Sequence, residues 1–260
     1  MARPLLWHLP ISHYSEKVRW ALDWKQVPHR RRVMPPGLHP LGGLLLTRGR
    51  VYTMPVVFMD EERFEDSTDI VAALERRYPS RPLYPSDDAA RRRALELEDW
   101  FDENVGAYAR QWAFNALLTE PEAVHAFARK QTEWAPWIPP DAFAPVAKAF
   151  LAARYSTSDR TGVEEARRRL VEGFDRLEAE LDGGEFLVGD RFTVADLTAA
   201  ALFYPLVLPP EGPWEPVRTA EFTAFQDSVR ERPGFRWVEE TFRRRRRPSA
   251  ATARRASPTM

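Results

Sequence analysis

The sequence predicts an α/β domain over its first 80 residues and an all-α domain over residues 86–242. In the first part, short apolar runs alternate with segments whose apolar residues have helical spacing. Beyond residue 86 the apolar residues recur with helical spacing only. Residues 81–85 lie between the two parts, contain Pro82 and Pro85, and are expected to form a linker.

The first strand is expected in the apolar run LLWHL, residues 5–9. Helical spacing begins after Ser12, which stands at the position of an N-cap residue, and the apolar face includes Tyr14 and Leu22. This helix is expected to end before Pro28, because proline does not continue a helix. The first two elements are therefore a strand and a helix.

The rest of the first part is expected to add three strands and a helix. Residues 29–34 predict the second strand, and residues 35–50 resemble a loop with a short helix around Leu44. The apolar stretch PVVFMD, residues 55–60, predicts the next strand, with a short fourth strand near Phe64.

The helix that closes the first part is expected in DSTDIVAALERRYP, with Asp66 or Ser67 as its cap. Several apolar stripes predict helices in the second part. The longest stripe runs from Val163 to Leu181 and stops at a pair of glycines, and a late helix is marked by residues 222–229.

Composition excludes some kinds of chemistry. The chain has no cysteine, which excludes disulfides, thiolate metal ligands and a cysteine nucleophile. No apolar run approaches the roughly 20 residues that a membrane span needs, and the N-terminus lacks the apolar core of a signal peptide. We therefore expect a cytoplasmic protein without a membrane span.

The formal net charge of zero conceals an uneven distribution. Residues 243–260 contain seven arginines and no acid, whereas the rest of the chain carries 31 basic and 38 acidic residues. Because this basic tail has few large apolar residues, we expect it to be disordered. It can attract nucleic acid or an anionic membrane, or stay solvated without a partner; we expect no specific nucleic-acid partner.

Three short stretches carry candidate chemistry. LPISHYSEKVRW places Ser12 at a helix start, where free N–H groups and the helix dipole favour anionic groups. YTMPVV places Pro55 at the first position of a strand, and FEDSTDI opens a helix with Asp66 and Ser67. Each stretch also has an ordinary structural interpretation, either as a cap or as a strand start.

The order and spacing of these stretches resemble the cytosolic glutathione S-transferase family. The segment FLVGDRFTVADL, residues 186–197, is similar to the family's C-terminal signature, in which Thr193 and Asp196 form a capping box. The resemblance implies a thioredoxin-like N-terminal domain joined to an all-α C-terminal domain. It also implies a homodimer and a bacterial-like member with the serine motif of the zeta and theta classes.

The resemblance implies that glutathione binds as co-substrate, without a metal. The backbone of Met54 before a cis-Pro55 is expected to bind the peptide, and Asp66 and Ser67 to hold the γ-glutamyl end. Asp66 departs from the Glu or Gln of many members, which shortens its reach. A cation is expected to bind the glycyl carboxylate, and three residues stay open for this role: His39, Arg48 and Arg50.

The catalytic residue implied by the resemblance is Ser12. Its hydroxyl, beside a helix N-terminus, would donate to the glutathione sulfur and lower the thiol pKa. Tyr14 is the alternative donor, although it also fits the apolar face. His13 is expected to point outward, and His8 either lines the site or is a satisfied residue at the strand end.

A second group of residues is expected to bind an electrophile. Five aromatic residues of the helical part either cover a hydrophobic substrate pocket or serve as core and dimer packing: Trp112, Phe114, Trp134, Trp137 and Phe143. The expected function is conjugation of glutathione to a small hydrophobic electrophile in detoxification, or a glutathione-dependent isomerisation or dehalogenation. The alternative is a non-catalytic module that binds a ligand or a protein. The absence of cysteine argues against thiol–disulfide exchange.

Overall fold

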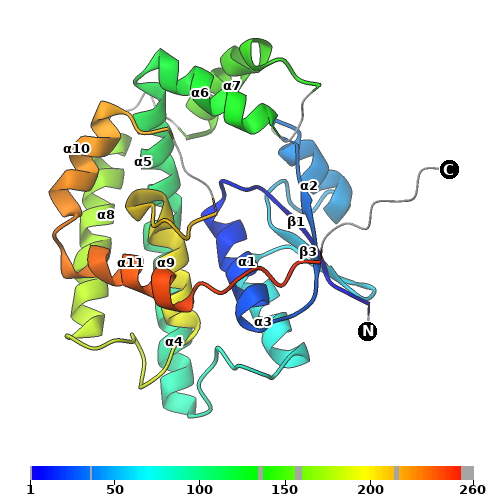
Figure 1. The fold of residues 1–260 in the computed structure, drawn as a ribbon, viewed down its shortest axis with the longest axis vertical. Helices are drawn as coiled ribbons and strands as arrows, with labels where there is room; N and C mark the ends of the chain where they lie inside the picture. Colours follow the sequence, from blue (N-terminus) through cyan, green and yellow to red (C-terminus); the bar gives the residue numbers. More distant parts are fainter. Residues whose placement is uncertain (1, 36, 134–136, 156–159, 214–216, 253–260) are drawn as a thin grey trace.

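The computed structural model describes residues 2–35, 37–133, 137–155, 160–213 and 217–252, and its N-terminal part is an α/β unit (Figure 1). This unit comprises β1 (Leu5–His8), α1 (His13–Trp24), β2 (Arg30–Val33), α2 (His39–Thr47), β3 (Val56–Met59), β4 (Glu62–Phe64) and α3 (Ser67–Arg77). The strands form one sheet in the order β2-β1-β3-β4, in which β1 and β2 are parallel and the other two pairs are antiparallel. Helices α1 and α3 pack against each other.

The α2 segment is the part of this unit whose sequence resembled a loop. It forms a nine-residue helix around Leu44, although it contains Gly42 and Gly43. The glycine at position 43 is required by a close approach, since a Cβ there would lie 2.8 Å from the carbonyl carbon of Tyr52. Glycine at this position therefore reflects packing of the helix on the next segment.

The second part is helical. It comprises α4 (Asp88–Phe101), a π-helix η1 (Asp102–Gly106), α5 (Ala107–Leu118), α6 (Pro121–Thr132), α7 (Pro140–Tyr155), α8 (Arg160–Leu181), α9 (Val194–Val207), α10 (Ala220–Val229) and α11 (Pro233–Arg245). Helix α9 lies at the centre and packs on α1, α4 and α11 (Figure 1). In the described ranges, no helix has the length and apolar character that crossing a membrane requires.

The capping box predicted at the start of α9 is confirmed. Thr193 is the N-cap, and the Asp196 carboxylate accepts from the Thr193 N–H at 2.7 Å and from the Leu187 N–H at 2.8 Å. Burial raises the pKa of Asp196 to about 6, against the effect of these hydrogen bonds. The box is structural, because it fixes the start of the helix on which both parts of the chain pack.

The π-helix η1 makes the first contact between the two parts. In a π-helix the hydrogen bonds run from i to i+5, so the carbonyl oxygens depart from the pattern of the flanking α-helices. The Tyr14 hydroxyl donates to the Asp102 carbonyl at 3.0 Å, and His13 Nε2 lies 2.9 Å from the Gly106 carbonyl. A Cβ at Gly106 would overlap the Tyr14 hydroxyl, so a glycine is needed here.

A buried ion cluster makes the second contact between the parts. The Lys17 ammonium on α1 lies 2.9 Å from a Glu98 carboxylate oxygen and 2.7 Å from Asp102 Oδ2. It also donates to Thr68 Oγ1 at 2.9 Å, so the cluster joins α1, α3 and the end of α4. The two carboxylates outweigh the effect of burial and raise the pKa of Lys17, which keeps the ammonium charged.

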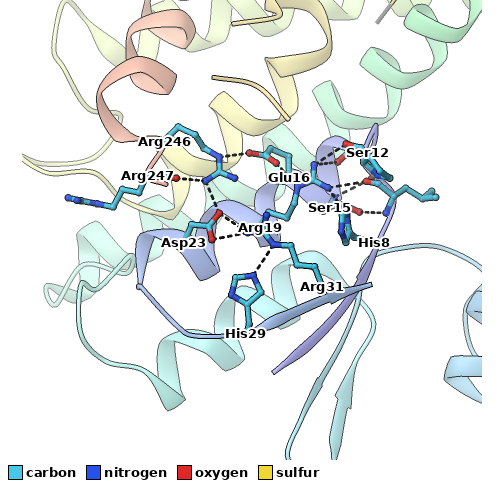
Figure 2. Close-up of polar contacts among 12 residues, drawn as sticks. His8, Ser12, Ser15, Glu16, Arg19, Asp23, His29, Arg31, Arg246 and Arg247 are labelled. Atoms are coloured by element: carbon cyan, nitrogen blue, oxygen red, sulfur yellow. Dashed lines mark hydrogen bonds and ion pairs between the residues drawn. The ribbon is translucent and has the colours of Figure 1, made fainter. Parts of the chain in front are cut away.

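The prediction of a disordered tail from residue 243 is wrong for residues 243–252. Helix α11 continues to Arg245, and the following segment crosses α1 to reach the sheet (Figures 1 and 2). The Arg246 side chain is only 10% exposed and is paired with Glu16 and Asp23, and residue 251 forms a parallel bridge with His29. Buried acids on α1 therefore hold part of the basic tail. Residues 253–260 lie outside the described residues.

Candidate functional site

A cavity of about 130 Å³ lies between the α/β unit and the helical part. Its wall on the α/β side includes Ser12, His39 and Met54, which the sequence predicted as site residues. The opposite wall is mostly apolar and includes Phe114, also predicted, and Phe127. The structure therefore brings four predicted residues from different segments to one cavity.

Ser12 caps α1 from the edge of this cavity. Its Oγ accepts a hydrogen bond from the Ser15 N–H at 3.2 Å, and its carbonyl accepts from the Glu16 N–H at 2.9 Å. As an acceptor for the backbone, the hydroxyl keeps its own hydrogen for donation. A group bound in the cavity beside Ser12 would also lie near the positive end of the α1 dipole.

The Met54–Pro55 peptide bond is cis, as the resemblance implied. Met54 lines the cavity and is separated only by Pro55 from β3, which pairs with β1. Because β1 leads directly into the Ser12 turn, the sheet places Met54 and Ser12 on neighbouring segments at one edge.

Asp66 and Ser67 open α3 but do not line the cavity. Asp66 is the N-cap, and its Oδ1 accepts from the Thr68 N–H at 2.8 Å and the Asp69 N–H at 3.3 Å. Asp66 is exposed, whereas Ser67 is buried. Both are on the first turn of the helix, where a carboxylate is favoured by the dipole and a carboxylate side chain can pair with an ammonium.

The structure separates the three candidate cations. His39 lines the cavity, where burial and then the nearby Arg154 lower its pKa to about 4, so it is neutral near pH 7. Arg50 is 71% exposed and lies 3.5 Å from Glu65, and Arg48 ends α2 in the left-handed conformation. His39 can therefore only donate or accept a hydrogen bond, and the permanent charges are at the arginines.

The Tyr14 hydroxyl is hydrogen-bonded outside the cavity. Its hydroxyl donates to the Asp102 carbonyl, and Tyr14 does not line the cavity that contains Ser12. Burial, followed by the charge of Asp102, raises its pKa to about 12. This geometry favours Ser12 over Tyr14 as the donor.

The prediction that His13 points outward is wrong. Its side chain is buried against the Gly106 carbonyl and lines the cavity. Burial and the charge of Arg110 lower its pKa to about 3, so the ring is neutral. His8 is a satisfied strand-end residue, with its Nδ1 2.9 Å from the Arg19 guanidinium.

The predicted aromatic cover is correct only in part. Trp112 is 1% exposed and packs on Phe222 and Phe225, so it belongs to the core and not to the cavity wall. Trp137 is exposed, and Phe143 lines a neighbouring cavity. The prediction for Trp134 lies outside the described residues.

Sequence reasoning missed several wall residues on α5 and α9. Arg110, Ala113 and Leu117 lie on the face of α5 that includes Phe114, and Tyr204 lies on α9. Their spacing of three and four residues predicts a shared helix face, but the face could equally have been buried in the core. In the described part of the chain, no cluster of three or more His, Cys, Asp or Glu residues could hold a metal ion.

The buried histidines predict a loss of stability in mild acid. Burial is the main cause that lowers the pKa of His8 to about 2, His13 to about 3 and His39 to about 4, and it also lowers the pKa of His29. Below pH 6.5 the unfolded chain therefore binds protons that the folded chain does not, and stability is lost as pH falls through this range. His8, His13 and His39 each contribute about 1.4 kcal/mol per pH unit between their lowered pKa and the ordinary value of 6.5.

Urea unfolding between pH 7.5 and 5 measures this effect. His39→Gln is expected to lower the number of protons that the chain takes up on unfolding by about one. Equal stability at pH 7 and pH 5 in the parent protein would contradict the prediction.

Two sequence profiles of one family match the chain. The profile described as Glutathione S-transferase, N-terminal domain, matches residues 6–82. The profile described as Glutathione S-transferase, C-terminal domain, matches residues 160–226. A search among curated protein sequences found no match.

Solved structures share the fold. The β-etherase LigF from Sphingobium sp. strain SYK-6 is 20% identical with a TM-score of 0.60, over 92% of this chain and 100% of LigF. A glutathione S-transferase from Methylobacterium radiotolerans, in complex with glutathione sulfonate, is 19% identical with a TM-score of 0.55, over 100% of both chains. FzlA from C. crescentus is 19% identical with a TM-score of 0.53, over 91% of this chain and 92% of FzlA.

The architecture and the profile matches agree. The two matched ranges together span more than half of the chain and fall in the α/β unit and the helical part. The α/β unit is thioredoxin-like, and the all-α domain follows it, as the sequence predicted. The chain therefore belongs to the glutathione S-transferase family.

Proposed function

We propose that this protein binds glutathione and activates its thiol for attack on a small hydrophobic electrophile. The observation that carries the proposal is the placement of Ser12 and Met54 at the edge of a mostly apolar cavity between the two domains. The hydroxyl and the helix N-terminus supply polar groups for a sulfur anion, and the opposite wall supplies an apolar surface. We assign the protein to the serine-type members that resemble the zeta and theta classes.

In this proposal the α/β unit orients glutathione. The peptide backbone of Met54 before cis-Pro55 pairs with the glutathione backbone, as an added strand would. The γ-glutamyl carboxylate binds at the N-terminus of α3 beside Ser67, and the α-ammonium pairs with Asp66. Arg50 carries a permanent charge for the glycyl carboxylate, and the neutral His39 contributes a hydrogen bond.

The sulfur then lies beside Ser12. A hydrogen bond from its hydroxyl favours the thiolate over the thiol and so lowers the thiol pKa. The sulfur attacks the electrophilic carbon, a bond from carbon to the leaving group breaks, and the leaving group departs with its electron pair. Ser12 is not the nucleophile and forms no covalent intermediate.

The wall formed by α5 and α6 would hold the electrophile. Phe114, Leu117 and Phe127 present apolar surface toward the cavity, and an aromatic or alkyl substrate buries its surface against them. Trp112 has no part in this binding, since it lies in the core.

Substitution at the start of α3 tests the proposed glutathione site. Asp66→Ala and Ser67→Ala are each expected to raise the half-saturating glutathione concentration about 10-fold, because each removes a partner of a charged group. Isothermal calorimetry with glutathione measures the effect. Cap loss at Asp66 costs on the order of 1 kcal/mol of stability, so thermal unfolding is followed in parallel. Unchanged affinity in both variants would place the γ-glutamyl end elsewhere.

Two assays test the function itself. We expect the protein to be retained on immobilised glutathione and to conjugate glutathione to chlorodinitrobenzene. Retention without conjugation would favour the alternative, a non-catalytic module that binds a ligand or a protein. Failure of both would reject glutathione as the ligand. The homodimer and the cytoplasmic, detoxifying role remain proposals from the family, and light scattering checks the first of them.

A further inference from the structure

A buried network of charges joins α1 to the segment that follows α11 (Figure 2). Glu16 and Asp23 are seven residues apart on one face of α1, and their side chains are fully buried. Each carboxylate lies between two guanidinium groups. Glu16 pairs with Arg19 at 2.6 Å and with Arg246 at 2.5 Å. Among the described residues, Arg246 is the only one paired with both carboxylates, because its Nη1 also lies 2.9 Å from Asp23 Oδ2.

The position of Arg246 is fixed by the segment around it. The Ala250 N–H donates to Asp23 Oδ1 at 2.8 Å, and the Thr252 N–H donates to the His29 carbonyl at 2.9 Å. On the other side, Trp20 Nε1 donates to the Arg245 carbonyl at 3.3 Å. These hydrogen bonds hold the segment against α1 and so fix the position of the Arg246 guanidinium in the network.

At the other end of the network, Arg19 holds the turn that carries Ser12. Its Nη1 donates to the Leu9 carbonyl at 3.1 Å, and its Nη2 donates to the Pro10 carbonyl at 3.1 Å and approaches the Ser12 carbonyl at 3.5 Å. Nη1 also lies 2.9 Å from His8 Nδ1, which accepts because the guanidinium always carries its hydrogens. One side chain therefore contacts four of the five positions from His8 to Ser12.

The geometry of Arg19 depends on Glu16. The Arg19 Nε donates to Glu16 Oε2, while Glu16 Oε1 faces Arg246 Nε. With one guanidinium on each oxygen, the carboxylate has one orientation that satisfies both partners. If Arg246 is removed, Oε1 of this fully buried side chain loses its ion pair, and the carboxylate and Arg19 are free to rearrange.

We propose that Arg246 is a positioning residue for the Ser12 hydroxyl, acting through Glu16 and Arg19 on the turn of residues 9–12. The tail segment then does more than stabilise the fold, because it sets where the hydroxyl points. The inference rests on the proposed function of Ser12 for its catalytic consequence, but the ordering of the turn is independent of glutathione.

The test compares four variants. Arg246→Met removes the guanidinium. Arg243→Met is the matched control, since Arg243 is exposed and pairs with Glu240 on its own helix. Val238→Ala is the control for stability, because Val238 is a fully buried residue of α11 with no contact in the charge network. Arg246→Lys serves as the conservative variant, which restores charge at one carboxylate.

Two measurements are made on each variant. Hydrogen exchange in the ligand-free protein is expected to rise at least tenfold at the Ser12 and Glu16 amides in Arg246→Met, and less in Arg246→Lys. The pH dependence of conjugation is expected to show a thiol pKa raised by about half a unit or more in Arg246→Met, with a nearly unchanged KM for glutathione. Both controls should match the parent at these amides and in the pH profile.

The outcomes separate the inference from the proposed function. If Arg246→Met and Val238→Ala give the same exchange at residues 9–16 and the same pH profile, Arg246 is only structural and the inference is wrong. If the parent protein does not bind glutathione, the proposed function is wrong, and the exchange data alone decide on the ordering of the turn. Should Arg246→Met fail to fold, Glu16→Gln and Arg246→Lys provide the same two measurements.

Discussion

Ser12→Ala is expected to lower the rate of glutathione conjugation about 10- to 100-fold near neutral pH. A hydrogen bond to a charged group is worth about 1.5–3 kcal/mol, and here it would stabilise the thiolate and the developing transition state. The affinity for glutathione should be nearly unchanged, because the peptide is held by other residues. The measurement is the pH dependence of turnover, in which the apparent thiol pKa should rise.

A pair of variants separates the hydroxyl from the cap. Ser12 also caps α1, and alanine removes both the donor and the cap. Glycine at an N-cap costs only a few tenths of a kcal/mol, whereas alanine costs about 1 kcal/mol. Ser12→Gly and Ser12→Ala should therefore differ in stability but lose activity equally, and Ser12→Thr should recover part of it. An unchanged thiol pKa in both the glycine and the alanine variant would show that Ser12 acts only as a helix cap and not as the hydrogen-bond donor to the sulfur.

Lys17→Met is expected to lower the free energy of unfolding by about 3–5 kcal/mol, a typical cost of leaving a buried charge without its partner. Glu98 is fully buried beside Lys17, and the Asp102 side chain is 19% exposed. Without the ammonium the two carboxylates repel each other between the domains, and burial already raises the pKa of Glu98. Urea unfolding at pH 7.5 measures the change.

Two further variants serve as controls for the Lys17→Met prediction. Lys148→Met, at an exposed position of α7, should leave stability within about 0.5 kcal/mol of the parent. Lys17→Met combined with Glu98→Leu should recover much of the loss, since an apolar pair replaces the unpaired charge. A loss below 1 kcal/mol in Lys17→Met alone would show that the ion cluster does not stabilise the domain interface.

The elements of the fold could be predicted because their determinants are local. Helical spacing, the prolines and the Thr193 capping box each act within about one turn, and the structure confirms the elements that they predicted. The tail could not be predicted in this way. From its composition, a segment with seven arginines is expected to be solvated. Arg246 instead forms ion pairs with Glu16 and Asp23, which lie more than 220 residues earlier in the chain. The sequence feature that could have indicated this contact is the presence of two acidic residues on the buried face of α1.

The candidate site was predictable on the side where the backbone forms it. Ser12, Met54 and His39 reach the cavity because strand ends and helix starts meet at one edge of the sheet. The side formed by the helical domain could not be predicted. The spacing of apolar residues identifies an apolar helix face, but it does not distinguish a face packed in the core from one that lines a cavity. Trp112 and Phe114 are two residues apart on α5, yet one is core and the other lines the cavity.

The π-helix also gives the chain one place before the substrate wall where its length can change by a residue. Residues 88–118 form one continuous helical stretch, interrupted only by the wider turn at 102–106. A turn of π-helix holds about one residue more than a turn of α-helix, so loss of one residue from 102–106 would restore ordinary winding and leave α5 facing nearly the same way. Arg110, Phe114 and Leu117 would then stay on the cavity wall. A deletion at the start of α5 itself has no such wider turn to absorb it; it would rotate the residues beyond it by about 100° and exchange several wall residues at once.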